Sequence, residues 1–219
     1  AQAEVFALRA AAHADLGDMP AAFKAVEAGR QVDPTALAPV RTEIELAMRV
    51  GETARARKAL DVALRLAPRE PHLIHLQGMF RQSDGDAKAA LSLYAQALAL
   101  DPQLLDARIA RGALNIDMGR MDDALPELDK AASLEPQEPR VAYLRRLIYL
   151  AKGDAKAAQA VYLDKIAALP LNEIVADKDL VQFAVAGGAA AFKVNCSPCH
   201  GSGAQGGDLA AMLATAQDR

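Results

Sequence analysis

A strict internal period constrains this sequence more than any other feature. Over residues 1–170 proline, glycine and alanine each recur at the same interval, every type in its own register. Successive members of each series stand thirty-four positions apart: Pro34, Pro68, Pro102, Pro136 and Pro170; Gly17, Gly51, Gly85, Gly119 and Gly153; and Ala22, Ala56, Ala90, Ala124 and Ala158. Three independent positions that keep phase over five periods indicate five copies of one structural unit.

Each recurring residue has a physical role in a helical hairpin. The glycine lies between two apolar-periodic segments, and it accepts the left-handed backbone conformation that ends a helix. An aspartate that follows the glycine, as in Gly85-Asp86, can cap the next helix. The alanine comes early in the second helix, where a small side chain lets two helices approach closely. Because proline cannot continue a helix, it ends the second one. Each unit is therefore predicted to be a helix, a tight turn, a helix and a proline stop.

The composition agrees with an all-α fold and excludes some kinds of partner. Hydrophobic residues make up 52% of the chain, aromatic residues only 4%, and tryptophan is absent. This mixture, dominated by alanine and leucine, favours closely packed helices over a β-rich core. The formal net charge of −3 gives no reason to expect a nucleic acid as partner. No apolar run approaches the roughly 18 to 20 residues that span a bilayer, so no membrane span is expected.

The repeat over residues 1–170 resembles the tetratricopeptide repeat (TPR), in which 34-residue hairpins stack into a superhelix. Gly78 and Gly112 keep the small position of the family's first helix, whereas the early tryptophan of the family is missing. The resemblance implies an all-α superhelix of five repeats that acts as a protein-binding scaffold and not as an enzyme.

In the TPR family the first helix of each hairpin lines a concave groove. The family's groove positions correspond here to Arg41, Glu45, Met48, His72, His75, Met79, Gln82, Asp106, Ile109, Ala113, Ile116, Arg140, Tyr143, Leu147 and Leu150. These residues are polar in the middle of the array and apolar toward the fifth repeat. The resemblance therefore implies a protein or peptide with apolar anchors as the ligand. The clamp with which some members hold a carboxylate is not found.

Two pairs of residues in the repeats, one of histidines and one of tyrosines, are candidates for a site or for the core. His72 and His75 lie three residues apart on one predicted helix face, so they could bind a metal together. The simpler interpretation is two ordinary groove histidines, because no further ligand is found at a suitable spacing. Tyr94 and Tyr162 occupy a position where the family packs a large side chain, and both are predicted to belong to the core. No catalytic constellation is found in the repeats.

The sequence changes character after Pro170 and contains the motif Cys196-Ser197-Pro198-Cys199-His200. This is the C-x-x-C-H form of a c-type haem attachment site. Two thiols one helical turn apart can add to the two vinyl groups of a haem, and the histidine that follows can bind the iron as proximal ligand. A thioredoxin-like redox pair, half of a zinc site and a chance motif are the alternatives. Met212 is the one later candidate for a distal ligand.

Residues around the motif carry two further resemblances. Gly188, Phe192 and Cys196 follow a G-x-x-x-F-x-x-x-C pattern that resembles the first helix of class I cytochromes c. Residues 171–207 resemble the first haem segment of the dihaem CcoP-type subunit of cbb3 cytochrome c oxidases. This resemblance implies one covalent haem c and a part in electron transfer. Only nineteen residues follow the motif, so residues 171–219 are expected to form an incomplete cytochrome domain.

Three functions remain open from the sequence. The chain could be a TPR scaffold that carries a haem c within an electron-transfer assembly, with cytochrome or oxidase components as partners. It could be an assembly factor of the cytochrome c maturation type, which binds apocytochrome-like peptides and has no haem of its own. It could also be a generic TPR scaffold with a truncated or fused tail. The start AQAEVFALRA shows no secretory signal, yet covalent haem attachment resembles chemistry done outside the cytoplasmic membrane, and a periplasmic location is expected.

Overall fold

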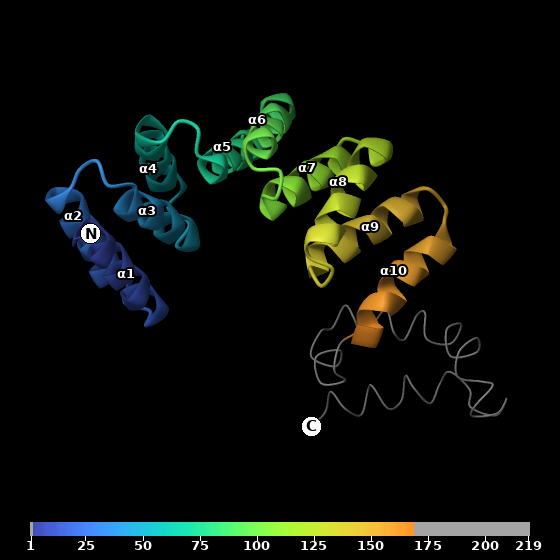
Figure 1. Ribbon diagram of the computed structural model, residues 1–219, viewed down its shortest axis with the longest axis horizontal. Coiled ribbons are helices and arrows are strands. Elements are labelled where there is room, and N and C mark those ends of the chain that lie inside the picture. Colours follow the sequence, from blue (N-terminus) through green and yellow to red (C-terminus); the bar gives the residue numbers. More distant parts are fainter. Residues whose placement is uncertain (1, 169–219) are drawn as a thin grey trace, which may run out of the picture. The chain divides into compact units, whose positions relative to one another are not determined.

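Residues 2–168 of the chain are described by a computed structural model, and their side chains are described as far as Val161. Over these residues the chain forms five antiparallel pairs of α-helices (Figure 1). The helices are α1 (Gln2–Asp15), α2 (Met19–Val32), α3 (Leu37–Arg49), α4 (Thr53–Leu66), α5 (Pro71–Ser83), α6 (Ala87–Leu100), α7 (Leu105–Asp117), α8 (Met121–Leu134), α9 (Pro139–Ala151) and α10 (Ala155–Ala168). The prediction of an all-α fold built from helical hairpins is confirmed.

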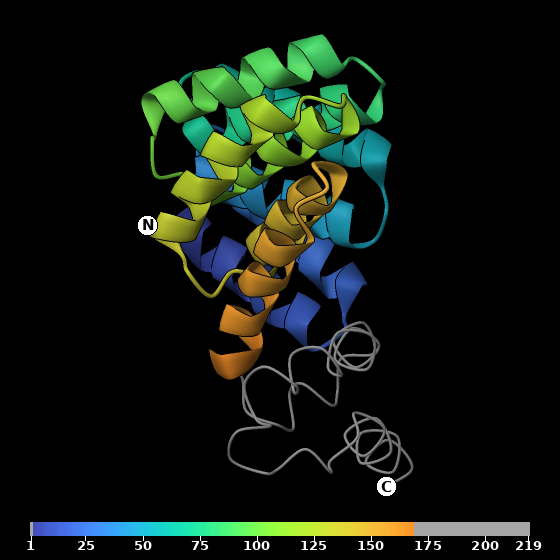
Figure 2. The same ribbon diagram turned by 90° about the vertical axis from the view of Figure 1, so that its right-hand side faces the viewer.

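The chain divides into two compact units, residues 1–136 and residues 137–219. The first unit contains α1 to α8, in which each hairpin packs against the next. In the second unit, α9 and α10 pack side by side as one hairpin (Figure 2). The predicted boundary at Pro170 lies outside the described residues and stays a prediction. None of the helices over residues 2–168 combines the length and the apolar character needed to cross a bilayer.

The glycine in each turn ends the first helix of its hairpin. Gly85 has φ of +82°, and the other four phased glycines have similar positive values. Since this region of backbone conformation strains any residue with a Cβ, the recurrence of glycine has a direct cause. The aspartate after Gly85 then caps the second helix, because the Asp86 carboxylate accepts a hydrogen bond of 3.0 Å from the backbone N–H of Ala89.

The phased prolines end the second helices as predicted. In the first unit α2, α4, α6 and α8 each stop two residues before a proline, and the intervening residue leaves the helical conformation. Asp33, which precedes Pro34, has φ −146° and ψ 98°, and Glu135, which precedes Pro136, has φ −138° and ψ 91°. These extended values are those that a following proline ring imposes.

Small residues set how closely the two helices of a hairpin approach. The phased alanines of the first four repeats are completely buried, and Ala158 in the fifth is 2% exposed. A Cβ added to Gly78 would lie 2.5 Å from the ring of Tyr94, so the tyrosine packs directly on the α5 backbone. Tyr94 is completely buried, as predicted for the core. Tyr162 lies beyond the residues whose side chains are described.

Candidate protein-binding groove

The first helices α3, α5, α7 and α9 carry the residues predicted to line a groove, and most of these remain accessible. In the first unit the exposed or half-buried ones are Arg41, Glu45, Met48, His72, Met79, Gln82, Asp106, Ala113 and Ile116. His75 and Ile109 are each only 5% exposed, so these two side chains contribute mainly packing. In the second unit Arg140, Tyr143 and Leu150 are exposed and Leu147 is half-buried.

Aromatic and imidazole rings cluster at the middle of the first unit. The His75 ring lies 5.6 Å from the Tyr94 ring and 5.9 Å from the His72 ring, measured between ring centres. The Tyr94 hydroxyl donates a hydrogen bond of 2.7 Å to the Gln82 side-chain oxygen. Gln82 is thus held by a residue of the core. Over the described residues no group of three or more His, Cys, Asp and Glu side chains is placed to bind a metal, so nothing adds a third ligand to His72 and His75.

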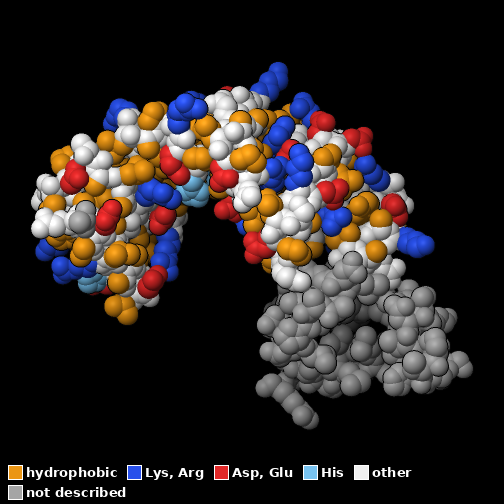
Figure 3. Space-filling view, in the orientation of Figure 1, with side chains coloured by type: hydrophobic (Ala, Val, Ile, Leu, Met, Phe, Trp, Pro, Cys, Tyr) orange, Lys and Arg blue, Asp and Glu red, His pale blue; other side chains and the backbone are white. Residues whose placement is uncertain are grey.

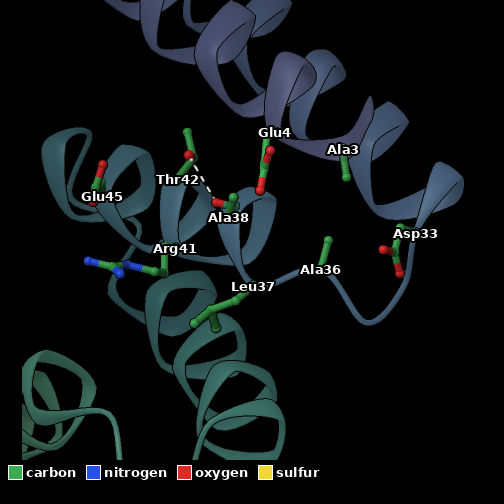
Figure 4. A pocket seen from close by; sticks show the side chains of 9 residues that line it. All are labelled: Ala3, Glu4, Asp33, Ala36, Leu37, Ala38, Arg41, Thr42 and Glu45. Carbon is green, nitrogen blue, oxygen red and sulfur yellow. Dashed lines mark hydrogen bonds between the residues drawn. The ribbon is translucent and has the colours of Figure 1, made fainter. Parts of the chain in front are cut away.

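A polar pocket of about 560 Å³ opens between the start of α1, the α2–α3 loop and α3 (Figure 4). Its lining includes Arg41 and Glu45 of the predicted groove, together with Glu4, Asp33 and Thr42. The Thr42 hydroxyl donates to the Ala38 carbonyl, and hydrogen bonds from the side chain and backbone of Thr35 lower the pKa of Asp33. Carboxylates outnumber the single guanidinium in this lining, so the pocket suits a partner group that donates hydrogen bonds.

One ion-pair cluster joins three helices, and no pattern in the sequence predicted it. Glu43 of α3 is 7% exposed and accepts hydrogen bonds from Arg30 of α2 at 2.6 Å and from Arg55 of α4 at 2.9 Å. The Arg55 guanidinium also lies 3.8 Å from the centre of the Phe23 ring. The carboxylate therefore connects the first two hairpins, and its partners come from segments that a single helix pattern cannot relate.

A second cluster has the same composition within the fourth repeat. Glu127 of α8 accepts hydrogen bonds from Arg108 at 2.9 Å and from Arg111 at 3.1 Å, both from α7. Arg108 also donates from Nε to the Pro102 carbonyl at 3.1 Å. Elsewhere on the face shown in Figure 3, basic and acidic side chains alternate with hydrophobic ones over α1 to α8. Such a mixed surface favours no strongly charged polymer as partner.

The pKa of Tyr94 gives the first unit a testable pH dependence. Burial raises this pKa to about 12, whereas an unfolded tyrosine ionises at about pH 10. Tyr94 therefore loses its proton at a lower pH in the unfolded chain than in the folded one. Its contribution to the free energy of unfolding is complete below about pH 10 and is lost as the pH rises toward 12. We expect the difference in urea midpoint between the wild type and Tyr94→Phe to shrink between pH 8 and pH 11. Equal losses in both proteins would contradict this assignment.

The residues predicted to attach haem lie outside the described part of the chain. Cys196, Cys199, His200 and Met212 all belong to residues 169–219. The haem site therefore stays a prediction.

Comparison with known proteins agrees with the repeat architecture. Residues 82–148 match the sequence model of the tetratricopeptide repeat family. The crystal structure of PilW, a type IV pilus biogenesis factor, superimposes with a TM-score of 0.69 at 17% identity, covering 88% of this chain and 93% of that chain. The TPR protein YrrB superimposes with a TM-score of 0.57 at 18% identity, covering 80% of this chain and 87% of that chain. At such identities the likeness concerns the fold alone.

One segment of the chain is similar to part of a cytochrome oxidase subunit. A stretch of 53 residues, 24% of this chain, is 62% identical to the cbb3-type cytochrome c oxidase subunit FixP of Rhizobium etli. The chain spans only 18% of the length of that subunit. The predicted resemblance to this oxidase subunit is confirmed for a segment of the chain. Residues 2–168 thus have the tetratricopeptide repeat fold, and the chain also contains a segment similar to a cbb3 oxidase subunit.

Proposed function

We propose that this protein is a TPR scaffold that binds a protein or peptide in its groove and carries one haem c in a periplasmic electron-transfer assembly. The observation that carries this proposal is the 62% identity over 53 residues to a cbb3 oxidase subunit, in a chain that contains one C-x-x-C-H motif. Cys196 and Cys199 would hold the haem through thioether bonds, and His200 would bind its iron. When bound, such a haem supplies one-electron transfer.

The donor set of the motif suits this group better than it suits its competitors. Each thiol S–H adds across one vinyl group and forms one thioether. This addition has no leaving group and needs no further residue of the chain. A structural zinc site needs four ligands drawn from Cys, His and carboxylates, and no second C-x-x-C pair accompanies these two cysteines in the sequence. Met212 is the candidate distal ligand, and a partner protein could equally complete the pocket.

Covalent attachment gives an all-or-none test. We expect the protein, expressed together with a cytochrome c maturation system, to show a c-type absorption spectrum and to gain the mass of one haem. Cys196→Ser combined with Cys199→Ser should lose both signals, because no thiol remains to form a thioether. His200→Ala should change the spectrum by removing the proximal ligand. A wild-type protein as colourless as the double variant would refute haem attachment.

The groove supports a second candidate, a maturation or assembly factor that binds apocytochrome-like peptides. Three observations favour it: most groove positions in the described helices are accessible, the second unit exposes Tyr143 and Leu150 as apolar anchors, and the related fold of YrrB has a peptide-binding site. A synthetic peptide of residues 189–207 should then bind a shortened protein that ends at Pro170. Tyr143→Ala should weaken this binding, whereas Leu100→Ala, outside the groove positions, should not. Undetectable binding of the peptide would exclude this candidate.

A further inference from the structure

A pocket of about 340 Å³ opens at the fourth repeat, between α6, α7 and the start of α8. It combines the apolar Leu91 and Pro126 with five polar or charged residues: Arg111, Asn115, Arg120, Asp122 and Asp123. All the groove positions lie among the described residues, and none of them lines this pocket. Its volume falls within the range of small-molecule sites, about 300 to 1,000 Å³. The pocket is therefore a candidate site separate from the groove.

The Asn115 side chain is buried in this lining without a hydrogen-bond partner. Asn115 is 5% exposed, and its backbone carbonyl accepts a hydrogen bond of 2.8 Å from the Arg120 N–H. Its side-chain amide exchanges no hydrogen bond with any other residue that the structure describes. The fold does not require an amide here, because Ala47 holds the same position of the second repeat and is completely buried. Since buried amides normally have partners, this one indicates a ligand that supplies them.

Arg120, which precedes α8, departs from a rule that the other repeats follow. At the same register position the other four repeats have an acidic residue: Asp18, Glu52, Asp86 and Asp154. Asp86 caps its helix through a hydrogen bond of 3.0 Å, whereas Arg120 makes no side-chain hydrogen bond to the start of α8. A cation at the positive end of a helix is locally unfavourable. Residues that break a local rule are expected at functional sites, so Arg120 indicates an anionic group in the pocket.

The charges of the lining define the chemistry of the ligand. Arg111 gives its Nη1 to Glu127 at 3.1 Å, which leaves its Nε and Nη2 as donors. Together with the Arg120 guanidinium these donors suit a carboxylate. Two carboxylates of the same lining, Asp122 and Asp123, would repel a simple anion, so the ligand must also carry a positive group. An α-amino acid carries both charges on a single carbon atom.

We propose that this pocket binds a free α-amino acid with an apolar side chain. The carboxylate of the ligand accepts hydrogen bonds from the guanidinium groups of Arg111 and Arg120 and from the Asn115 amide. The ammonium group of the ligand donates to the Asp123 carboxylate. Leu91 and Pro126, the two apolar residues of the lining, contact its side chain. This site depends neither on the groove nor on the proposed haem.

Calorimetric titration of the full chain with matched small molecules tests the need for both charges. The probes are L-alanine, L-valine and L-leucine, together with 4-methylpentanoate, which is leucine without its amino group, and 3-methylbutylamine, which is leucine without its carboxylate. We expect binding of the amino acids, leucine included, and binding about tenfold weaker or less for each leucine fragment, because each leaves one charge of the lining without its partner. Equal binding of 4-methylpentanoate and leucine would identify a simple anion site and overturn the proposal. No binding of any of the three amino acids at millimolar concentration would also overturn it.

Two variants distinguish ligand binding from a structural role of the same residues. Arg120→Asp installs the capping residue of other repeats, so it should raise the urea midpoint while it weakens leucine binding about tenfold or more. Asn115→Ala introduces the residue that the second repeat has at this position, and it should weaken binding while circular dichroism shows the helices retained. Lys130→Gln, on α8 outside the pocket, is the matched control and should leave the affinity unchanged. An unchanged affinity for leucine in both pocket variants would contradict the proposal.

Discussion

Replacing Tyr94 with alanine is expected to lower the free energy of unfolding by about 3 to 5 kcal/mol, the range for truncating a large buried aromatic side chain. Tyr94 is completely buried, and its ring packs on the backbone of α5 at Gly78. Because Gly78 has no side chain to fill the space, the cavity left by the change cannot collapse easily. Urea denaturation followed by circular dichroism measures the loss.

Two further variants show whether packing or the hydroxyl group causes this loss. Tyr94→Phe keeps the ring but removes the hydrogen bond to Gln82, and it should cost about 1 kcal/mol. Leu100→Ala removes a side chain that is 37% exposed, and it should cost much less than Tyr94→Ala. Similar losses for Tyr94→Ala and Tyr94→Phe would show that the ring contributes little, which contradicts the packing at Gly78.

The repeat architecture could be predicted because its determinants are local. A positive φ at Gly85, an extended residue before Pro34 and a buried Ala90 each depend on the residue type and on its place within one hairpin. The same requirements return once in every repeat, so the sequence shows them as a period. The order of helix, glycine turn, helix and proline stop, together with the small positions of the interface, was therefore accessible without coordinates.

The exposure of individual groove residues could not be predicted in the same way. Arg41, His75 and Ile109 hold the same position in successive repeats, yet Arg41 is half-buried and the other two are almost inaccessible. What decides this is the neighbouring side chain, such as Tyr94 beside His75. Glu43 was missed for a related reason: its arginine partners come from helices on either side, at spacings outside the repeat period.

Glu127→Ala is expected to lower the free energy of unfolding by about 3 kcal/mol, because it leaves two arginines facing a buried site without their carboxylate. The side chains of Glu127 and Arg108 are each 11% exposed, whereas that of Arg111 is 35% exposed. Solvent can therefore screen Arg111 but cannot reach Arg108 to the same extent. Most of the loss should come from Arg108, and urea denaturation of the full chain measures it.

A double-mutant cycle assigns that loss to the pair. Arg108→Met alone removes one charge but leaves Glu127 its second partner, Arg111, at 3.1 Å, so it should cost less than Glu127→Ala. In the double variant, Arg108→Met with Glu127→Ala, no charge stays buried, and the summed single losses should exceed the measured loss by about 1 kcal/mol or more. Strictly additive losses would mean that Glu127 acts through packing alone. Because α7 also carries Asp106 of the candidate groove, a positive coupling would show that a charge pair stabilises one of the helices that form this groove.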